Sequence, residues 1–81
     1  MRLAVVYRHA ASREVVEATL RYERERRGLG GAFLDEIARI ERHVCDAPGL
    51  YQLVEAPIRR ATLRRFPFGL FYLEELDRIV V

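Results

Sequence analysis

Lysine is absent from this 81-residue sequence, and cysteine occurs only once, as Cys45. A single cysteine cannot form an internal disulfide, which excludes a disulfide-stapled secreted scaffold. No apolar run approaches the roughly 18 residues of a membrane helix, and the N-terminus lacks the long apolar segment of a secretory signal. We therefore expect a cytoplasmic protein without a membrane-spanning segment.

Several kinds of chemical site are also missing from the sequence. His9 and His43 stand far apart with no cysteine pair beside them, so we predict no metal site. The glycine-rich stretch 28–31 lacks both the lysine and the preceding strand of a phosphate-binding loop. Ser12 has no evident base partner and is interpreted as a helix N-cap. His9, at a strand end, is either a surface histidine or a general base, and we predict no catalytic residue and no cofactor.

What the sequence does have is arginine, which supplies all fourteen of its basic residues. Codon bias in a GC-rich genome is one explanation, and the bidentate contacts that arginine makes with carboxylate and phosphate are another. The net charge of only +2 excludes a generic polycation. Four arginines are concentrated between residues 58 and 65 with no acid among them, namely Arg59, Arg60, Arg64 and Arg65.

Length and composition predict a single domain over residues 1–81. Hydrophobic residues make up 51% of the chain and charged residues 32%, which is typical of a folded globular protein. A chain of this size buries about 60% of the surface that its unfolded form exposes, so we expect modest stability.

The N-terminal half predicts one strand followed by two helices. Residues 3–7 are short, apolar and β-branched, as in a buried strand. A first helix is expected from about Arg13 to Arg27, and glycines 28–31 should form the turn after it. A second helix is expected from about Ala32 to Asp46, because Phe33, Ile37, Ile40 and Val44 repeat at helical spacing. Cys45 falls on the same stripe and is interpreted as a small buried residue.

The C-terminal half predicts an antiparallel meander. An irregular connection over 50–57 should pack along the sheet edge, and strands are expected over 58–65, 69–74 and 79–81, with a turn at 66–69. Alternation places Ala61 and Leu63 against the helices, with Arg60 and Arg64 on the other face. The expected fold is α+β: a two-layer β-α-α-β-β-β sandwich with a helical hairpin on one face of an antiparallel sheet.

The arginine-rich strand is the candidate binding site. Its side chains suit phosphates or a run of acidic side chains. Nearby aromatic rings would stack bases or anchor a partner helix, and these are Phe66, Phe68 and Tyr72. An ordinary hairpin with solvated arginines is the alternative interpretation.

Three stretches resemble the ParE/RelE toxin superfamily of bacterial toxin–antitoxin systems, the plasmid-stabilisation group. Residues 21–30, with Arg21-Tyr22-Glu23 and Arg26-Arg27-Gly28-Leu29-Gly30, resemble the family's "WYE…RPGLG". Residues 32–37 resemble its "RFLDEVE", and residues 59–72 resemble its "VRRALLRRFPYGIYY". The stretches cover most of the chain in the family's order, and the third is the most specific. The family's β-α-α-β-β-β fold is the one expected above from periodicity.

The resemblance implies a toxin that is neutralised by a cognate antitoxin. One branch of the family cleaves messenger RNA on the ribosome, and the ParE-like branch poisons DNA gyrase. The basic positions of the RNA-cleaving branch are only partly matched: Arg60 fits one, Thr62 occupies another, and Gly69 stands where an arginine often follows. We therefore expect ParE-like inhibition of gyrase, with a ribosome-dependent ribonuclease and a non-toxic antitoxin-binding module as alternatives. The helical hairpin, including Tyr22 and Arg26, is expected to meet the antitoxin.

The resemblance also has a departure at the C-terminal end. Family members usually continue past residues 79–81 through a full strand ending near "HxxRDP", so we expect this chain to be short or truncated there. A missing strand would leave a sheet edge unpaired. An antitoxin segment, or a second copy of the chain forming a homodimer, would be able to pair with such an edge.

Overall fold

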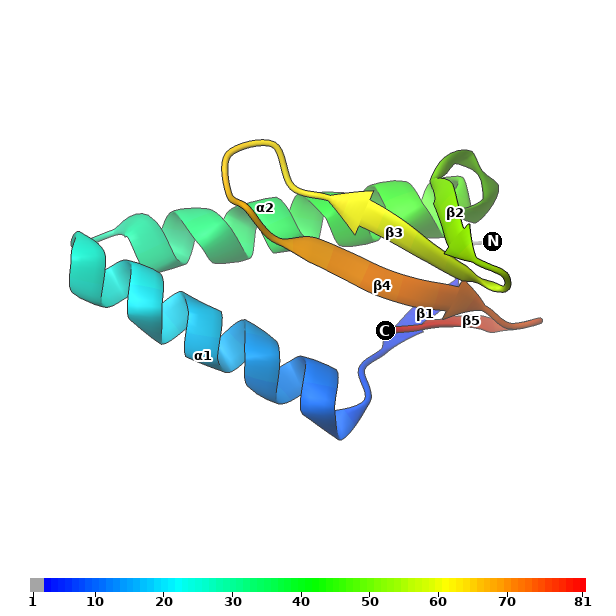
Figure 1. Ribbon diagram of the computed structural model, residues 1–81, viewed down its shortest axis with the longest axis horizontal. Helices are drawn as coiled ribbons and strands as arrows, with labels where there is room; N and C mark the ends of the chain where they lie inside the picture. The colour runs from blue at the N-terminus through cyan, green and yellow to red at the C-terminus, as the bar shows by residue number, and fades with distance from the viewer. Residues whose placement is uncertain (1–2) are drawn as a thin grey trace.

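The computed structural model describes residues 3–81 and has the α+β architecture expected from the sequence (Figure 1). Two helices pack against a five-stranded sheet. In chain order the elements are β1 (Ala4–Val6), α1 (His9–Glu25), α2 (Leu29–Asp46), a short 3-10 helix η1 (Pro48–Leu50), β2 (Gln52–Glu55), β3 (Ile58–Thr62), β4 (Gly69–Glu74) and β5 (Arg78–Val80).

The sheet runs in the order β1-β5-β4-β3-β2, so β4 is its central strand. The pairs from β2 to β5 are antiparallel, whereas β1 lies parallel to β5 at one edge. Two further backbone bonds join the last residue to the start of the chain: Arg8 N to Val81 O and Val81 N to Val6 O, each 2.9 Å. The first strand therefore joins the sheet beside the C-terminal meander, and its parallel pairing with β5 makes the sheet mixed.

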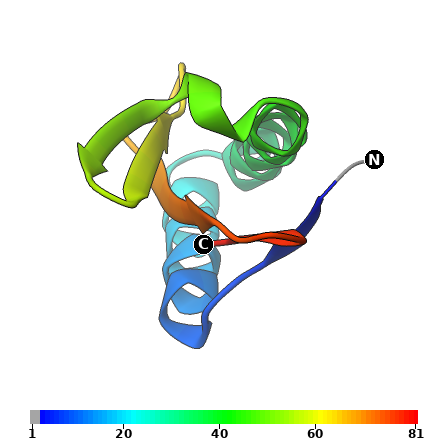
Figure 2. The same ribbon diagram turned by 90° about the vertical axis from the view of Figure 1, so that its right-hand side faces the viewer.

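The core lies between the sheet and α2. The apolar stripe of α2 is buried, with Phe33 fully enclosed and Ile37, Ile40 and Val44 exposing 5% or less. The facing strands alternate as expected, since Ala61 is buried while Arg60 is exposed. Seen along its length, the molecule has α2 within the angle formed by the twisted sheet (Figure 2). Tyr7 joins β1 to this helix, its hydroxyl donating to Glu41 Oε2 at 2.5 Å.

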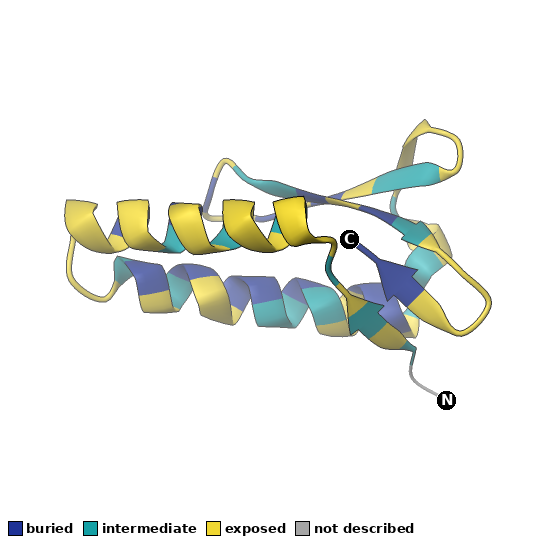
Figure 3. Cartoon of the chain, turned by 90° about the horizontal axis from the view of Figure 1, so that it is seen from below, coloured by how far each residue is buried: buried dark blue, intermediate teal, exposed yellow. Residues whose placement is uncertain are grey.

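Helix α1 packs mainly on α2 and keeps much of its surface in solvent (Figure 3). Of its residues only Ala18 and Tyr22 are buried. The predicted start at about Arg13 is wrong: the helix begins at His9, and Ser12 lies inside it instead of capping it. Arg8 occupies the N-cap with extended backbone and no side-chain cap. The apolar spacing of Ala11 and Val15 extends the helical pattern back through this first turn, which the capping signal at Ser12 obscured.

Helix α2 begins at Leu29, three residues earlier than expected, so most of the glycine stretch is helical. Among these glycines only Gly28 lies in the turn, where it follows Arg26 and Arg27 and has φ +90°. Glu23 of α1 then accepts the amides of Gly28 at 3.1 Å and Gly30 at 3.0 Å, which satisfies backbone donors at the start of α2. A Cβ on Gly30 would lie 2.8 Å from Thr19 O, so a side chain there would push the two helices apart.

Two predictions about the strands need correction. Residues 52–55 are not irregular: they form β2, the other edge strand, which pairs with β3 around a bulge between Leu53 and Glu55. Strand β3 ends at Thr62 and not at residue 65, because the next residues leave the ladder to form a loop. Strand β4 spans Gly69–Glu74 as predicted.

Candidate functional site

The hairpin loop over residues 63–68 carries the centre of the candidate site, and we call it the arginine loop. Its backbone closes on itself, with Leu63 N bound to Phe68 O at 2.9 Å and Phe68 N bound to Phe66 O at 2.8 Å. Leu63 and Phe66 turn inward and are buried, while Arg64 and Arg65 are exposed. The loop therefore presents two guanidinium groups outward while its apolar side chains hold it on the core.

The four arginines of the candidate site do not share one face. Arg59 points toward the helix side of β3 and donates from Nη1 to Tyr51 O at 2.7 Å. Arg60 lies on the outer face, where its Nη2 donates to Gln52 Oε1 at 3.1 Å. Within residues 3–81, no carboxylate forms an ion pair with any of the four arginine side chains. The charge of Arg60, Arg64 and Arg65 is thus available to an anionic partner on the outer face and around the loop.

Gly69 leaves room for Arg60. The two lie on neighbouring strands, and a Cβ on Gly69 would sit 3.3 Å from Arg60 Cγ. The aliphatic part of Arg60 therefore rests over the glycine, and its guanidinium extends beyond toward β2. Gly69 thus has a structural role, which is to make space for the Arg60 side chain. In the toxin superfamily that the sequence resembles, an arginine often stands at this position.

The aromatic residues of the candidate site are core side chains. Phe66 exposes 6% of its surface, and its ring packs edge-on against that of Tyr22 with centroids 4.8 Å apart. Phe33 completes the cluster, with ring centroids 5.2 Å from Tyr22 and 5.0 Å from the half-buried Phe68. Stacking on bases by these rings, or direct antitoxin contact by the Tyr22 ring, would require them to leave the core.

Tyr72 is also enclosed, exposing 2% of its surface. Its hydroxyl donates to Pro48 O at 2.6 Å. Burial raises the pKa of Tyr72 to about 12, against the opposing effect of the Arg59 charge. The side chain thus ties β4 to η1, directly after α2, as a neutral phenol.

Phe71 is the exposed aromatic residue beside Arg60. The candidate site predicted from the sequence did not include it. Phe71 exposes 53% of its surface and lies directly across from Arg60 in the β3–β4 ladder. Arg60 in turn lies across from Gln52 in the β2–β3 ladder, so the three side chains form a row on the outer face. Apolar residues occupy both faces of β4, and this feature of the sequence indicates that one aromatic ring of the strand faces outward.

Glu36 is the second residue that the sequence did not single out. It exposes only 7% of its surface and lies under the arginine loop. Its Oε2 accepts the amide of Arg64 in a short bond and the amide of Arg65 at 3.3 Å, and Arg39 Nη2 lies 3.5 Å away. The sequence does contain an indication of this role. Glu36 interrupts the apolar stripe of α2, and an acid is expected at such a buried position only if it has hydrogen-bond or charge partners.

Burial acts to raise the pKa of the Glu36 carboxyl. The hydrogen bonds from the Arg64 and Arg65 amides, with the charge of Arg39 and its hydrogen bond, outweigh that effect and hold the pKa below its ordinary value. Glu36 is therefore an ionised group that is committed to holding the loop.

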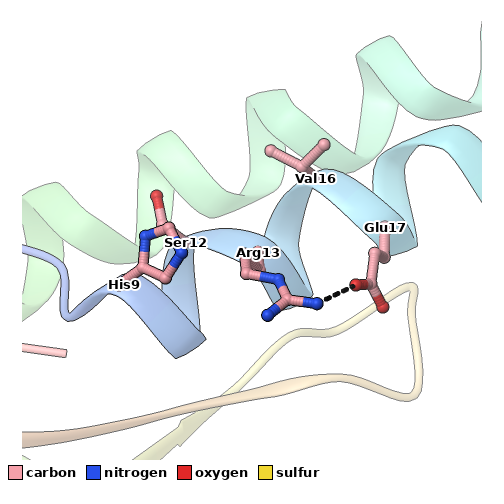
Figure 4. A pocket seen from close by; sticks show the side chains of 5 residues that line it. All are labelled: His9, Ser12, Arg13, Val16 and Glu17. Carbon is pink, nitrogen blue, oxygen red and sulfur yellow. Dashed lines mark ion pairs between the residues drawn. The ribbon is translucent and has the colours of Figure 1, made fainter.

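A shallow pocket on α1 contains the other residues considered for chemistry (Figure 4). Its lining is His9, Ser12, Arg13, Val16 and Glu17. The polar contact drawn there is an ion pair of 3.9 Å between Arg13 Nη2 and Glu17 Oε1, both about two-thirds exposed. Such a surface pair contributes little, roughly 0–1 kcal/mol. No assembled acid–base pair is seen in this pocket among the described residues.

Arg26, the other residue expected to meet the antitoxin, is exposed at the end of α1 and lies beyond its last turn. None of the helices in residues 3–81 has the length and apolar character needed to cross a membrane. Over the same residues, His, Cys, Asp and Glu side chains form no group of three that would suit a metal ion. No family model, curated protein or solved structure matches this chain.

Proposed function

We propose that this chain is the toxin component of a type II toxin–antitoxin pair, that it inhibits DNA gyrase, and that a cognate antitoxin neutralises it. The observation that carries the proposal is the exposed charge of Arg60, Arg64 and Arg65, which no carboxylate of residues 3–81 neutralises. One of these groups, Arg60, lies directly across from the half-exposed Phe71 in the β3–β4 ladder. Arginine with an aromatic ring is the composition typical of interface hot spots.

Binding is favoured over RNA cleavage by the state of the nearby titratable groups. General acid–base catalysis needs a group that is free to exchange a proton in the site. Glu36 is held ionised by two loop amides, and the Tyr72 hydroxyl is bound to Pro48 O with its pKa raised to about 12. Both groups serve the fold, which leaves the arginines to recognise a partner.

The ribonuclease remains the second candidate because guanidinium groups also suit phosphates. Arg60 and Phe71 lie side by side on the outer face of the sheet, where a phosphate and a base of single-stranded RNA would fit together. In that case the proton-transfer group would come from the RNA or from the ribosome.

The deciding experiment compares the two targets with one protein preparation. Purified protein is titrated into a gyrase supercoiling assay and, separately, into ribosomes translating a defined messenger RNA. We expect loss of supercoiling, no cleavage at codons, and relief when Arg60 and Arg64 are both replaced by Ala. Arg42→Ala, an exposed arginine on α2, is the matched control and should inhibit like the wild type. Codon-specific cleavage, or full supercoiling at high protein excess, would reject the gyrase proposal.

The free edge of β2 supports the antitoxin part of the proposal. All four residues of this strand are exposed and its outer edge is unpaired, and Leu50 beside it exposes 82% of its surface. An extended antitoxin segment would add a strand there, while Arg26 and the exposed side of α1 would contact its helical part. Light scattering of the protein alone tests the alternative of a homodimer through the same edge, which would appear as a doubled mass.

A further inference from the structure

The contact between Glu36 and the arginine loop has an unusual geometry. A single carboxylate oxygen, on a helix, accepts the amides of two consecutive residues, Arg64 and Arg65, from a loop 28 and 29 residues later in the chain. Successive amides that converge on one oxygen form an anion-binding concavity of the backbone. Here the anion belongs to the protein itself, so the loop is bound from within.

This contact determines which side chains the loop turns outward. With the amides of Arg64 and Arg65 directed at α2, Leu63 and Phe66 on either side of them fall into the core. Leu63 exposes 4% and Phe66 exposes 6%, whereas both arginines are exposed. Without an acceptor below the loop, these two amides would be left partly buried and unsatisfied, which is costly.

We propose that Glu36 is the positioning residue of the binding site: its ionised carboxylate orients the loop backbone so that Arg64 and Arg65 face the partner. Loss of that negative charge, by protonation or by substitution, releases the loop and weakens partner binding. The inference rests on the proposed function for the identity of the partner. The charged group that the described contacts place against Glu36 is Arg39 on its own helix, whereas Arg64 and Arg65 reach the carboxylate through their backbone amides.

The first test follows the loop in the wild-type protein, without any variant. Amide protons that donate to a carboxylate resonate far downfield, so the Arg64 and Arg65 amides should titrate together in nuclear magnetic resonance spectra. Their common midpoint should lie below the ordinary value of 4.5 for a glutamate. Amide shifts at these two positions that do not change as the pH is lowered to the onset of unfolding would overturn the proposal.

The second test separates positioning from simple stability. Glu36→Gln removes the charge but keeps an oxygen acceptor, and Asp35→Asn makes the same change at the exposed neighbouring position on α2. At neutral pH and well below the unfolding temperature, we expect Glu36→Gln to bind gyrase about tenfold more weakly, with Asp35→Asn unchanged. Equal binding by the two folded variants would overturn the proposal. If the wild type does not bind gyrase at all, the proposed function fails, and the amide titration still decides the role of Glu36 in the loop.

Discussion

Replacement of Phe66 by Ala is a direct test of whether this ring belongs to the core or to a partner surface. Phe66 lies in the arginine loop, yet it exposes only 6% of its surface. Its ring centroid is 4.8 Å from that of Tyr22 and 5.3 Å from that of Phe33, both in edge-on geometry. The Arg65 guanidinium lies 5.8 Å from the same ring. A residue packed in this way should be needed for folding whether or not a partner is present.

The expected cost is large compared with the stability of a small domain. Truncation of a buried Phe to Ala costs about 3–5 kcal/mol, part from lost transfer energy and part from the cavity that remains. At about 0.05–0.15 kcal/mol per residue, a chain of this length has roughly 4–12 kcal/mol in total. The variant should therefore lose between a quarter and all of its free energy of unfolding.

Urea unfolding followed by circular dichroism measures this loss. We expect the midpoint for Phe66→Ala to fall markedly, with the slope unchanged if unfolding stays two-state. Phe71→Ala is the matched control, because that ring is 53% exposed on the outer face and its loss should change stability by no more than about 0.5 kcal/mol. Equal midpoints for Phe66→Ala and the wild type would refute the assignment of this ring to the core.

Three other predictions concern the helix junction and the pH dependence. Glu23→Ala should cost about 1–2 kcal/mol because the Gly28 and Gly30 amides lose their acceptor, whereas Glu25→Ala should be nearly neutral in the same urea experiment. Gly28→Ala should cost about 1 kcal/mol by thermal unfolding, since the position needs φ +90°. Gly31→Ala should stabilise the protein by up to about 1 kcal/mol, because the new methyl group would meet nothing within 4 Å apart from its chain neighbours and the adjacent helix backbone. Because the folded pKa of Glu36 is below its ordinary value of 4.5, the carboxylate stabilises the fold above that pH, and this stability is lost as the pH falls through the folded pKa. Acid titrations of unfolding free energy should therefore be flatter for Glu36→Gln than for the wild type, and parallel curves would contradict this role.

Periodicity was sufficient to predict the layers of the fold. The stripe from Phe33 to Val44 identified α2, and the alternation of Ala61 and Leu63 with Arg60 identified which face of β3 meets it. These patterns are reliable because each records burial against one neighbouring layer. The start of α2 could not be predicted in the same way, because glycine is a local turn signal. The glycines at the start of α2 are helical here because Glu23, on the preceding helix, accepts the amide of Gly30.

The candidate site was predicted less well, for a related reason. Arg60 is found on the outer face where alternation placed it, whereas Arg64 is exposed on the loop because β3 ends at Thr62. The position of an aromatic ring in a loop gives no such indication of its direction. Phe66 is turned inward, where it packs against the rings of Tyr22 and Phe33. Local sequence cannot reveal that tertiary contact.

The proposed function depends most on the positive charge that Arg60 and the two loop arginines, Arg64 and Arg65, offer to a partner. The most direct test is the dissociation constant of the purified protein for gyrase across a range of salt concentration, for the wild type and for a variant with Arg60, Arg64 and Arg65 replaced by Ala. We predict wild-type binding that weakens as salt rises, and a variant that remains folded but binds at least about tenfold more weakly with a smaller dependence on salt. Binding of the folded variant that equals the wild type at every salt concentration would contradict the account.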